Sequence, residues 1–254
     1  MPITVEEFAA IEPLLTEEER AVRDMVRKFV ADRLLPRVTD DFEHHRFARE
    51  LVAEIAALGI LGASLKGYGC AGISPVAYGL ACQELEYGDS GFRSFVSVQS
   101  SLAMYAIWRF GSEEQKQRWL PEMAAGRAIG CFGLSEPESG SDPASMRTRA
   151  VRDGDDWLLT GEKMWITNAQ IADVAVVWAK TGDDAASVRG FLVERPMPGF
   201  SSHNIDYKLS MRASFTGSLN LADVRVPDRN RLPEAVGMRG PLSCLTSARF
   251  GVSF

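Results

Sequence analysis

The pattern of apolar residues changes near residue 128, and this change constrains the fold of the chain more than any other feature. Before it, apolar side chains repeat at helical spacing, and the repeats begin at capping residues such as Thr16 and Ser112. After it, short β-rich runs alternate with turn residues, as at residues 153–155. A block of helices followed by a block of strands predicts an α+β fold and disfavours alternating βαβ units.

The same change in pattern divides the chain into domains. We expect an N-terminal helical domain over residues 1–127 and a β-rich middle domain over residues 128–232. After Pro233 the sequence becomes helical again, so residues 233–254 are predicted to begin a C-terminal helical domain. Because the apolar face of this last segment has no later segment to pack on, we expect the chain to be incomplete.

Composition narrows the classes of function that the chain can have. Its net charge of −6 offers no basic footprint for a nucleic-acid backbone. The four cysteines are widely spaced without a CxxC pair, and none of the three histidines lies at metal-ligand spacing from a cysteine. We therefore expect reduced thiols, no metal site and no nucleic-acid partner.

The sequence also bears on location. Its acidic N-terminus has neither the apolar core of a signal peptide nor the Arg- and Ser-rich pattern of a transit segment. No apolar run reaches the roughly 18 residues that a membrane-spanning helix needs. We expect a soluble protein with no membrane span, in the cytoplasm of a bacterium or in the mitochondrial matrix of a eukaryote.

Residues 67–72 match the dinucleotide-binding motif G-x-G-x-x-G letter for letter. That motif requires a strand before it and a helix directly after it, inside a βαβ unit. Here helical patterns precede the glycines, and the next helix start is displaced to Ser74 and Pro75. We therefore interpret the segment as a loop whose glycines supply positive φ angles.

Two segments of the middle domain carry groups that suit a flat heterocycle and a pyrophosphate. Residues 132–142 present serine hydroxyls, backbone N–H groups and glycines that allow close approach. Further along, Trp165, Ile166 and Thr167 supply an aromatic plane, an apolar face and a hydroxyl on a β-like run. Taken alone, residues 132–142 are also typical of a polar loop with capping serines, and residues 165–167 are also typical of a strand whose tryptophan packs in the core.

Together, in this order and after a helical first half, the two segments resemble the flavin-binding signature of the acyl-CoA dehydrogenases. The resemblance covers essentially the whole chain. It implies an N-terminal all-helical domain, a β-barrel-like domain that binds FAD, and only the start of a C-terminal helical domain. The FAD contacts that it implies are Phe132, Leu134, Ser135, Gly140, Ser141, Trp165, Ile166 and Thr167.

A narrower match, over residues 84–101, resembles the glutaryl-CoA dehydrogenase subgroup. Arg93 interrupts an apolar stretch, where a guanidinium is costly unless an anion meets it. Its planar donor fork suits a carboxylate. The resemblance implies that Arg93 binds the far carboxylate of a glutaryl chain with help from Ser94 and Glu86. An Arg93–Glu86 ion pair on one helical face is the structural alternative.

The last match lies at residues 242–249, which on their own pattern form the start of an amphipathic helix. In the family this segment begins the C-terminal helical domain and touches the CoA part of the substrate. Together with Ser141, the acyl-CoA contacts implied here are Leu242, Leu245, Thr246 and Arg249.

The reaction that the resemblance implies is α,β-dehydrogenation of an acyl-CoA thioester, with glutaryl-CoA oxidised and decarboxylated to crotonyl-CoA. Its other implied partners are an electron-transfer flavoprotein as acceptor and further copies of the chain in a homotetramer. The glutamate that acts as base in the family lies beyond residue 254, so we assign no catalytic residue. Losing a general base costs about 10²–10⁴ in rate, so we expect little turnover from these residues alone.

Two other hypotheses stay open. The chain could be a non-catalytic remnant that still binds flavin or acyl-CoA. It could also be an acyl-CoA dehydrogenase for another substrate, in which Arg93 serves the structure alone.

Overall fold

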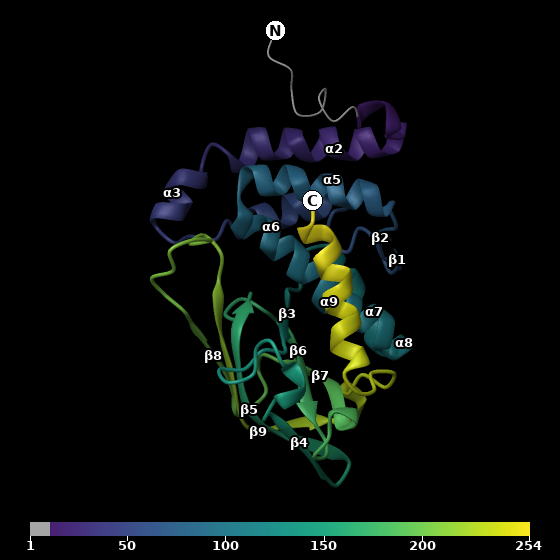
Figure 1. The fold of residues 1–254 in the computed structure, drawn as a ribbon, viewed down its shortest axis with the longest axis vertical. Helices are drawn as coiled ribbons and strands as arrows, with labels where there is room; N and C mark the ends of the chain where they lie inside the picture. Colours follow the sequence, from purple (N-terminus) through teal and green to yellow (C-terminus); the bar gives the residue numbers. More distant parts are fainter. Residues whose placement is uncertain (1–10) are drawn as a thin grey trace.

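Helices occupy the first half of the chain, as the sequence predicts (Figure 1). The computed structural model describes residues 11–254, so residues 1–10, with which the expected N-terminal domain begins, lie outside the described residues. The α-helices of this half are α2 (Glu17–Phe29), α3 (Val38–Glu43), α4 (Leu51–Ala57), α5 (Pro75–Gly88), α6 (Ser90–Ser97), α7 (Tyr105–Phe110) and α8 (Glu113–Ala124). A 3₁₀ turn, η1 (Glu12–Leu14), precedes α2, and the π-helical segments η2 (Val30–Leu34) and η3 (Val98–Met104) continue α2 and α6.

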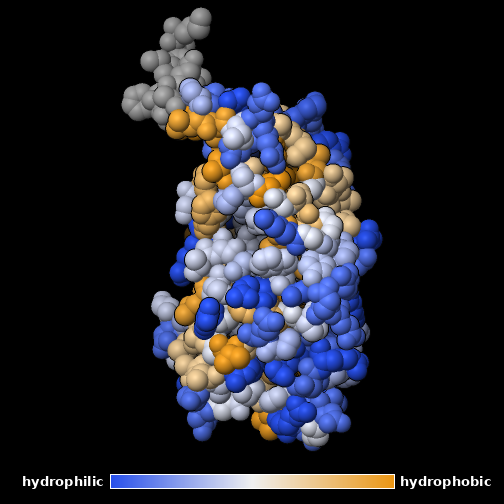
Figure 2. Space-filling model, turned by 90° about the vertical axis from the view of Figure 1, so that its right-hand side faces the viewer, coloured by the Kyte–Doolittle hydropathy of each residue, from blue (hydrophilic) through white to orange (hydrophobic). Residues whose placement is uncertain are grey.

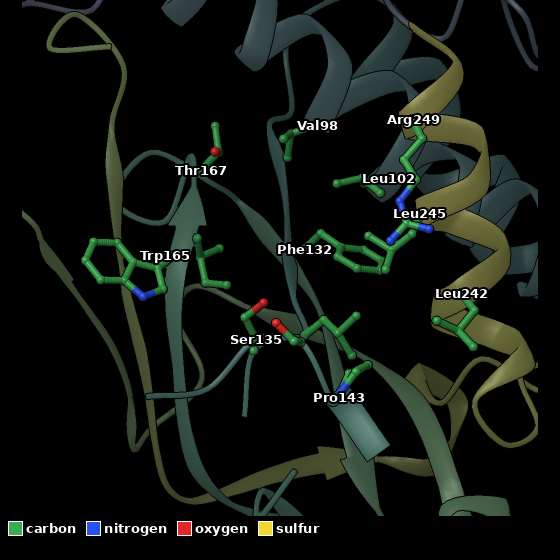
Figure 3. Close-up of a pocket in the computed structure, with 14 residues that line it drawn as sticks. Val98, Leu102, Phe132, Ser135, Pro143, Trp165, Thr167, Leu242, Leu245 and Arg249 are labelled. Atoms are coloured by element: carbon green, nitrogen blue, oxygen red, sulfur yellow. The ribbon is translucent and has the colours of Figure 1, made fainter. Parts of the chain in front are cut away.

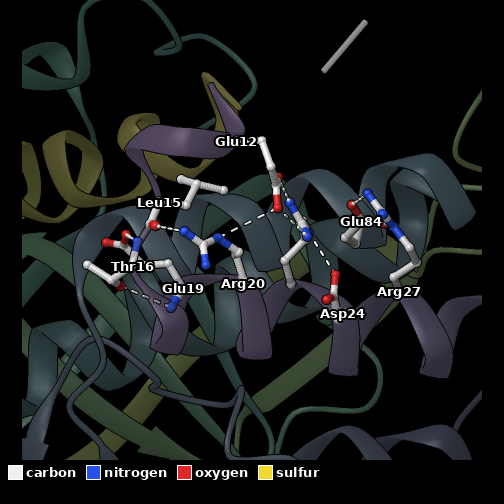
Figure 4. A network of polar contacts seen from close by, with 9 residues as sticks. Glu12, Leu15, Thr16, Glu19, Arg20, Asp24, Arg27 and Glu84 are labelled. Carbon is white, nitrogen blue, oxygen red and sulfur yellow. Dashed lines mark hydrogen bonds and ion pairs between the residues drawn. The ribbon is translucent and has the colours of Figure 1, made fainter. Parts of the chain in front are cut away.

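Side-chain caps determine where α2 begins (Figure 4). The Thr16 hydroxyl accepts a hydrogen bond from the backbone N–H of Glu19 at 3.2 Å, and the Glu19 carboxylate accepts one from the backbone N–H of Thr16 at 2.9 Å. The second Glu19 oxygen accepts a hydrogen bond from the Ser74 hydroxyl at 2.8 Å, and Ser74 in turn caps α5. The predicted capping box is confirmed, and it also joins the starts of two helices that pack together.

The helical run from α6 through η3 to α7 is continuous, but it is not a regular α-helix. Its central part is η3, where the π-helical backbone marks a local irregularity of the kind often found at functional sites. The buried amide of Gln99 donates to the carbonyl of Ala128 at 2.9 Å and accepts from the N–H of Gly130 at 2.7 Å. This side chain therefore attaches η3 to the first strand of the sheet.

A small antiparallel hairpin, β1 (Lys66–Gly67) and β2 (Cys70–Ala71), lies where the sequence predicts a loop. The positive φ angles expected there are present, at 82° for Gly67 and 81° for Gly69. The pairing was missed because each strand has only two residues, too few to show an alternating pattern. No βαβ unit surrounds these glycines, since the hairpin leads into α5 after a short connection.

A mixed sheet forms the second half of the described chain (Figure 1). Seven strands pair within residues 11–254 in the order β3-β6-β4-β5-β9-β8, with β7 beside β6. The strands are β3 (Gly130–Gly133), β4 (Arg149–Asp153), β5 (Asp156–Thr167), β6 (Val174–Lys180), β7 (Val188–Glu194), β8 (Phe200–Asn204) and β9 (Thr216–Pro227), with 3₁₀ turns η4 (Pro143–Ser145), η5 (Ala185–Ser187) and η6 (Asp228–Asn230) between them. β3 and β4 run parallel to β6, and the other pairs are antiparallel. The predicted fold class, helices first and then a curled, barrel-like sheet, is confirmed.

The last helix, α9 (Arg239–Val252), runs from the sheet back to the helical part and contacts η3, α7 and α5 (Figure 1). Its inner face buries Cys244 completely, and the ring of Phe254 lies where a side chain at Gly79 would otherwise project. Leu242 and Val252 remain exposed. The apolar face of this segment, which was expected to have no later segment to pack on, therefore packs in part on the helices that precede it.

The surface differs between the two halves. On the face shown in Figure 2, hydrophobic residues are concentrated over the helical part, and the sheet part is mainly hydrophilic. None of the helices described is long and apolar enough to cross a membrane. Within residues 11–254, no group of three or more histidine, cysteine, aspartate or glutamate side chains is placed to hold a metal ion.

Candidate functional site

A cleft with a volume of about 280 Å³ lies where β3, the end of β5, η3 and α9 meet (Figure 3). All of the residues implied as FAD contacts line it, although they come from two segments that are separated in sequence. The full lining consists of Val98, Leu102, Phe132, Leu134, Ser135, Gly140, Ser141, Pro143, Trp165, Ile166, Thr167, Leu242, Leu245 and Arg249. The structure therefore brings the two predicted segments into one site.

β3 places the first of these segments. It is buried along its whole length and pairs in parallel with β6, so its end is held in the sheet. Phe132, near that end, packs on Trp178 with ring centroids 5.9 Å apart. Beyond β3 the chain turns sharply, because the backbones of Glu136 and Ser139 exchange hydrogen bonds at 2.9 and 3.2 Å. This turn presents Gly140 and Ser141 to the cleft.

A β-bulge in β5 places the second segment. β5 pairs with β9 at Lys163–Leu219 and again at Ile166–Gly217, so β5 has one more residue than β9 between the two pairs. Trp165 lies in the bulge with φ of 63°, a left-handed conformation that is strained for a bulky residue. Trp165 is 62% exposed, and its indole lies at the opposite end of the cleft from Leu242 and Arg249 (Figure 3). The sequence predicts the tryptophan at the site but not the bulge that turns it outward.

α9 and η3 supply the remaining wall. Leu242, Leu245 and Arg249 of α9, which were predicted as acyl-CoA contacts, line the cleft. Thr246, the fourth residue predicted there, is not part of the lining, and its hydroxyl donates to the Leu242 carbonyl at 3.0 Å. Val98 and Leu102 of η3 also line the cleft. Neither is predicted by the sequence, since an apolar residue in a long apolar helix carries no distinguishing signal.

Glu86, Arg93 and Ser94 do not line the cleft but lie together on α5 and α6. The Arg93 guanidinium donates to the Glu86 carboxylate at 2.5 Å, which is the ion pair of the structural alternative. The two residues lie on different helices, α5 and α6, and not on one helical face as predicted. Burial raises the pKa of Glu86, but the Ser90 hydroxyl and Arg93 outweigh it and hold that pKa below its ordinary value. Arg93 precedes the cleft residue Val98 on the same helical run, which corresponds to roughly 7–8 Å along the axis.

Two buried charged residues adjoin the cleft without having been predicted. Lys163 is fully buried, and its ammonium group lies 2.8 Å from the carboxylate of Glu136. Burial lowers the pKa of Lys163 to about 8, although Glu136 opposes this change. The alternation along β5 could have revealed Lys163, because it falls on the same face as the buried Leu159. The loop sequence around Glu136 holds no comparable signal.

Comparison with known proteins agrees with this arrangement of helices and sheet. Residues 16–127 match the N-terminal domain of the acyl-CoA dehydrogenases, and residues 131–224 match the middle domain of the same family. The two matches together cover most of the chain and follow each other in the family's order. The chain belongs to the acyl-CoA dehydrogenase family.

Individual relatives cover nearly all of this chain but only part of their own length. A glutaryl-CoA dehydrogenase from Mycobacterium smegmatis, solved in complex with FADH2, is 57% identical in sequence, and its structure superimposes with a TM-score of 0.94. The match covers 97% of this chain and 63% of the chain of that enzyme. The butyryl-CoA dehydrogenase of Megasphaera elsdenii is 32% identical with a TM-score of 0.90, and the match covers 94% of this chain and 64% of that enzyme's chain. The mitochondrial short-chain specific acyl-CoA dehydrogenase of Homo sapiens is 36% identical, and the match covers 94% of this chain and 59% of the relative.

Proposed function

We propose that the cleft binds FAD and that residues 128–232 form the flavin-binding domain of an acyl-CoA dehydrogenase. The observation that carries this proposal is the assembly of residues 132–142 and residues 165–167 around one cleft. Each segment alone is typical of an ordinary loop or strand, but a loop with accessible donors facing an aromatic and apolar strand end suits a flavin. Membership of a family with FAD-bound relatives supports the same cofactor.

The shape of the cleft fits part of this cofactor. Gly140 lines it without a left-handed φ, and a Cβ added there meets no atom within 4 Å, so nothing inside the chain requires glycine at this position. A volume of about 280 Å³ lies at the lower end of the range for small-molecule sites, which suits a ring system rather than a whole dinucleotide. Ser135, Ser141 and Thr167 are the hydroxyl-bearing residues that would bind the cofactor.

The α9 side of the cleft is the proposed acyl-CoA side. When bound, FAD supplies the electron sink for removal of a hydride from an acyl-CoA thioester. Leu242 and Leu245 offer apolar contacts, and Arg249 offers a cation to the phosphates of CoA. No carboxylate lines the cleft among the residues that the structure describes, so we assign the general base to none of them.

We propose glutaryl-CoA as the substrate, with decarboxylation to crotonyl-CoA. Support comes from the 57% identity to a glutaryl-CoA dehydrogenase and from Arg93, whose side chain is 15% exposed on the helical run that continues into the cleft wall. Arg93 also lies 3.5 Å from the hydroxyl of Ser97, so several polar groups converge there. A ligand carboxylate competes with Glu86 for this guanidinium.

The Arg93–Glu86 ion pair favours a second candidate, an acyl-CoA dehydrogenase for an uncharged acyl chain. In that case Arg93 serves the structure alone, and similarity to butyryl-CoA and short-chain dehydrogenases supports such a substrate. An electron-transfer flavoprotein as acceptor and a homotetrameric assembly are further proposals, which rest on family membership alone.

The variant Arg93→Gln separates the two substrates. Because it removes the charge that attracts a carboxylate, we expect glutaryl-CoA affinity to fall by about tenfold or more, while butyryl-CoA affinity stays within about twofold. Calorimetric titration of the chain with each thioester measures both. Arg33→Gln is the matched control, since Arg33 forms an exposed ion pair with Glu54 on other helices. Equal losses for the two thioesters would contradict the glutaryl-CoA proposal.

A further inference from the structure

Glu136 and Lys163 form a buried ion pair directly beside the cleft. Lys163 is 0% exposed and Glu136 is 6% exposed, and a distance of 2.8 Å separates the ammonium nitrogen from the carboxylate. Neither residue is among those that line the cleft. The pair lies between the two segments that do line it.

The pair joins the turn after β3 to β5. The Lys163 ammonium also donates to the carbonyl of Leu134 at 3.1 Å. The next residue of β5, Met164, donates its backbone N–H to the carbonyl of Ser135 at 2.9 Å. Three consecutive residues of the turn are thus hydrogen-bonded to two consecutive residues of β5, immediately before the bulge that carries Trp165.

Glu136 extends the connection to a third segment. Its carboxylate accepts hydrogen bonds from the backbone N–H groups of Arg147 at 2.6 Å and Thr148 at 3.0 Å, and from the Thr148 hydroxyl at 2.6 Å. These residues precede β4, which pairs with β5 in the sheet. Together with the backbone hydrogen bonds between Glu136 and Ser139, the carboxylate fixes both ends of the turn that presents Gly140 and Ser141.

Stability alone is a weak reason for such a pair. Desolvation of two buried charges offsets most of their attraction, and well-packed apolar replacements are often equally stable. Apolar contacts have no directional preference, whereas the ion pair between the Lys163 ammonium and the Glu136 carboxylate specifies one relative placement of the turn and β5. The polar contacts of Glu136 are all satisfied by donors from named segments, so moving the turn would break several of them together.

We infer that Glu136 and Lys163 are positioning residues that hold residues 134–142 against β5 and so set the geometry of the FAD site. The inference rests on the proposed function, because it concerns the affinity of the cleft for FAD. Neither residue is a catalytic residue, since both act through the cleft residues beside them.

The test uses Lys163→Met, Glu136→Gln and the double variant of the 254-residue chain. Asp41→Asn is the matched control, because Asp41 is a buried carboxylate paired with Arg37 in the helical half, outside the cleft lining. FAD affinity is measured by fluorescence titration at a temperature below every melting transition. The visible circular dichroism of bound flavin reports its orientation in the site, which a purely structural role would not change.

We expect each single variant to weaken FAD binding by on the order of tenfold and to alter the flavin dichroism. The double variant is expected to bind no more weakly than the worse single variant, because the two residues act as one unit. Asp41→Asn is expected to lower the melting temperature while leaving FAD affinity unchanged. Unchanged affinity and dichroism in the two single variants and the double variant of Glu136 and Lys163 would overturn the inference and leave the proposed function intact.

Hydrogen exchange of the FAD-free chain supplies a second readout that does not depend on the cofactor. The amides of Glu136, Ser139 and Met164 are expected to exchange faster in the Lys163→Met chain than in the Asp41→Asn chain. Equal exchange at these amides would also overturn the inference. If the unmodified chain fails to bind FAD, the proposed function fails, and this inference about the FAD site fails with it.

Discussion

At the scale of single residues, Gly140 is the position where the proposed cofactor would most directly explain the choice of residue. Neither its φ nor the packing around it requires glycine, since an added Cβ would project into open space. The residue nevertheless lies on the cleft beside Ser141. A missing side chain keeps that space and the neighbouring backbone N–H groups accessible to a ligand.

The variant Gly140→Val tests this reading. The valine side chain would clash with no other residue, but it would occupy part of the cleft. We therefore expect FAD affinity to fall by about tenfold or more while the melting temperature changes little. Ala144→Val, in the neighbouring turn η4 and outside the cleft lining, is the matched control. Titration with FAD and thermal unfolding measure the two effects. A large loss of stability without loss of FAD affinity would contradict the interpretation.

The residues that line the cleft were predictable where they belong to a sequence motif. They were not predictable where only the folded chain brings them to the cleft. The motif at residues 132–142 and the run at residues 165–167 do meet at one cleft. Lys163 escaped attention because a lysine in a strand normally faces solvent, whereas the turn after β3 covers this one. The left-handed Trp165 could not be foreseen, since a bulge depends on the register with β9.

At the scale of elements, local hydrogen bonding determines where helices begin. The capping box at Thr16 was predictable because its donors and acceptors lie within one turn. The π-helical η3 was not predicted, and the carbonyls that its Gln99 binds come from the end of α8 and the connection beyond it. Local patterns therefore predict the ends of elements better than the irregularities inside them.

Replacing Thr16 by alanine measures the contribution of one such cap. The change leaves the backbone N–H of Glu19 without its acceptor and removes half of the box, so we expect a loss of about 1 kcal/mol in the free energy of unfolding. Urea denaturation followed by circular dichroism provides the value. The exposed Thr39→Ala in α3 is the control and should cost less than about 0.5 kcal/mol. Equal effects of the two changes would show that the cap does not stabilise α2.

At the scale of the whole molecule, the order of the strands decides which segments form the cleft. The strand order β3-β6-β4-β5 separates the two predicted segments within the sheet, and the turn after β3 brings them together again. The α+β class was predictable because helices and strands occupy separate halves of the sequence. The strand order was not, since pairing between distant strands leaves no periodic signal in a single sequence.

The most direct test of the central claim is the visible absorption spectrum of the 254-residue chain after mixing with FAD and removal of unbound cofactor. Our account predicts a flavin band that stays with the protein. On anaerobic addition of glutaryl-CoA we expect the band to persist without bleaching, because no carboxylate lines the cleft within the described residues. A bleached band would place a working base in this chain and correct that assignment. A colourless protein, with all of the flavin in the small-molecule fraction, would contradict the claim that this cleft is a flavin site.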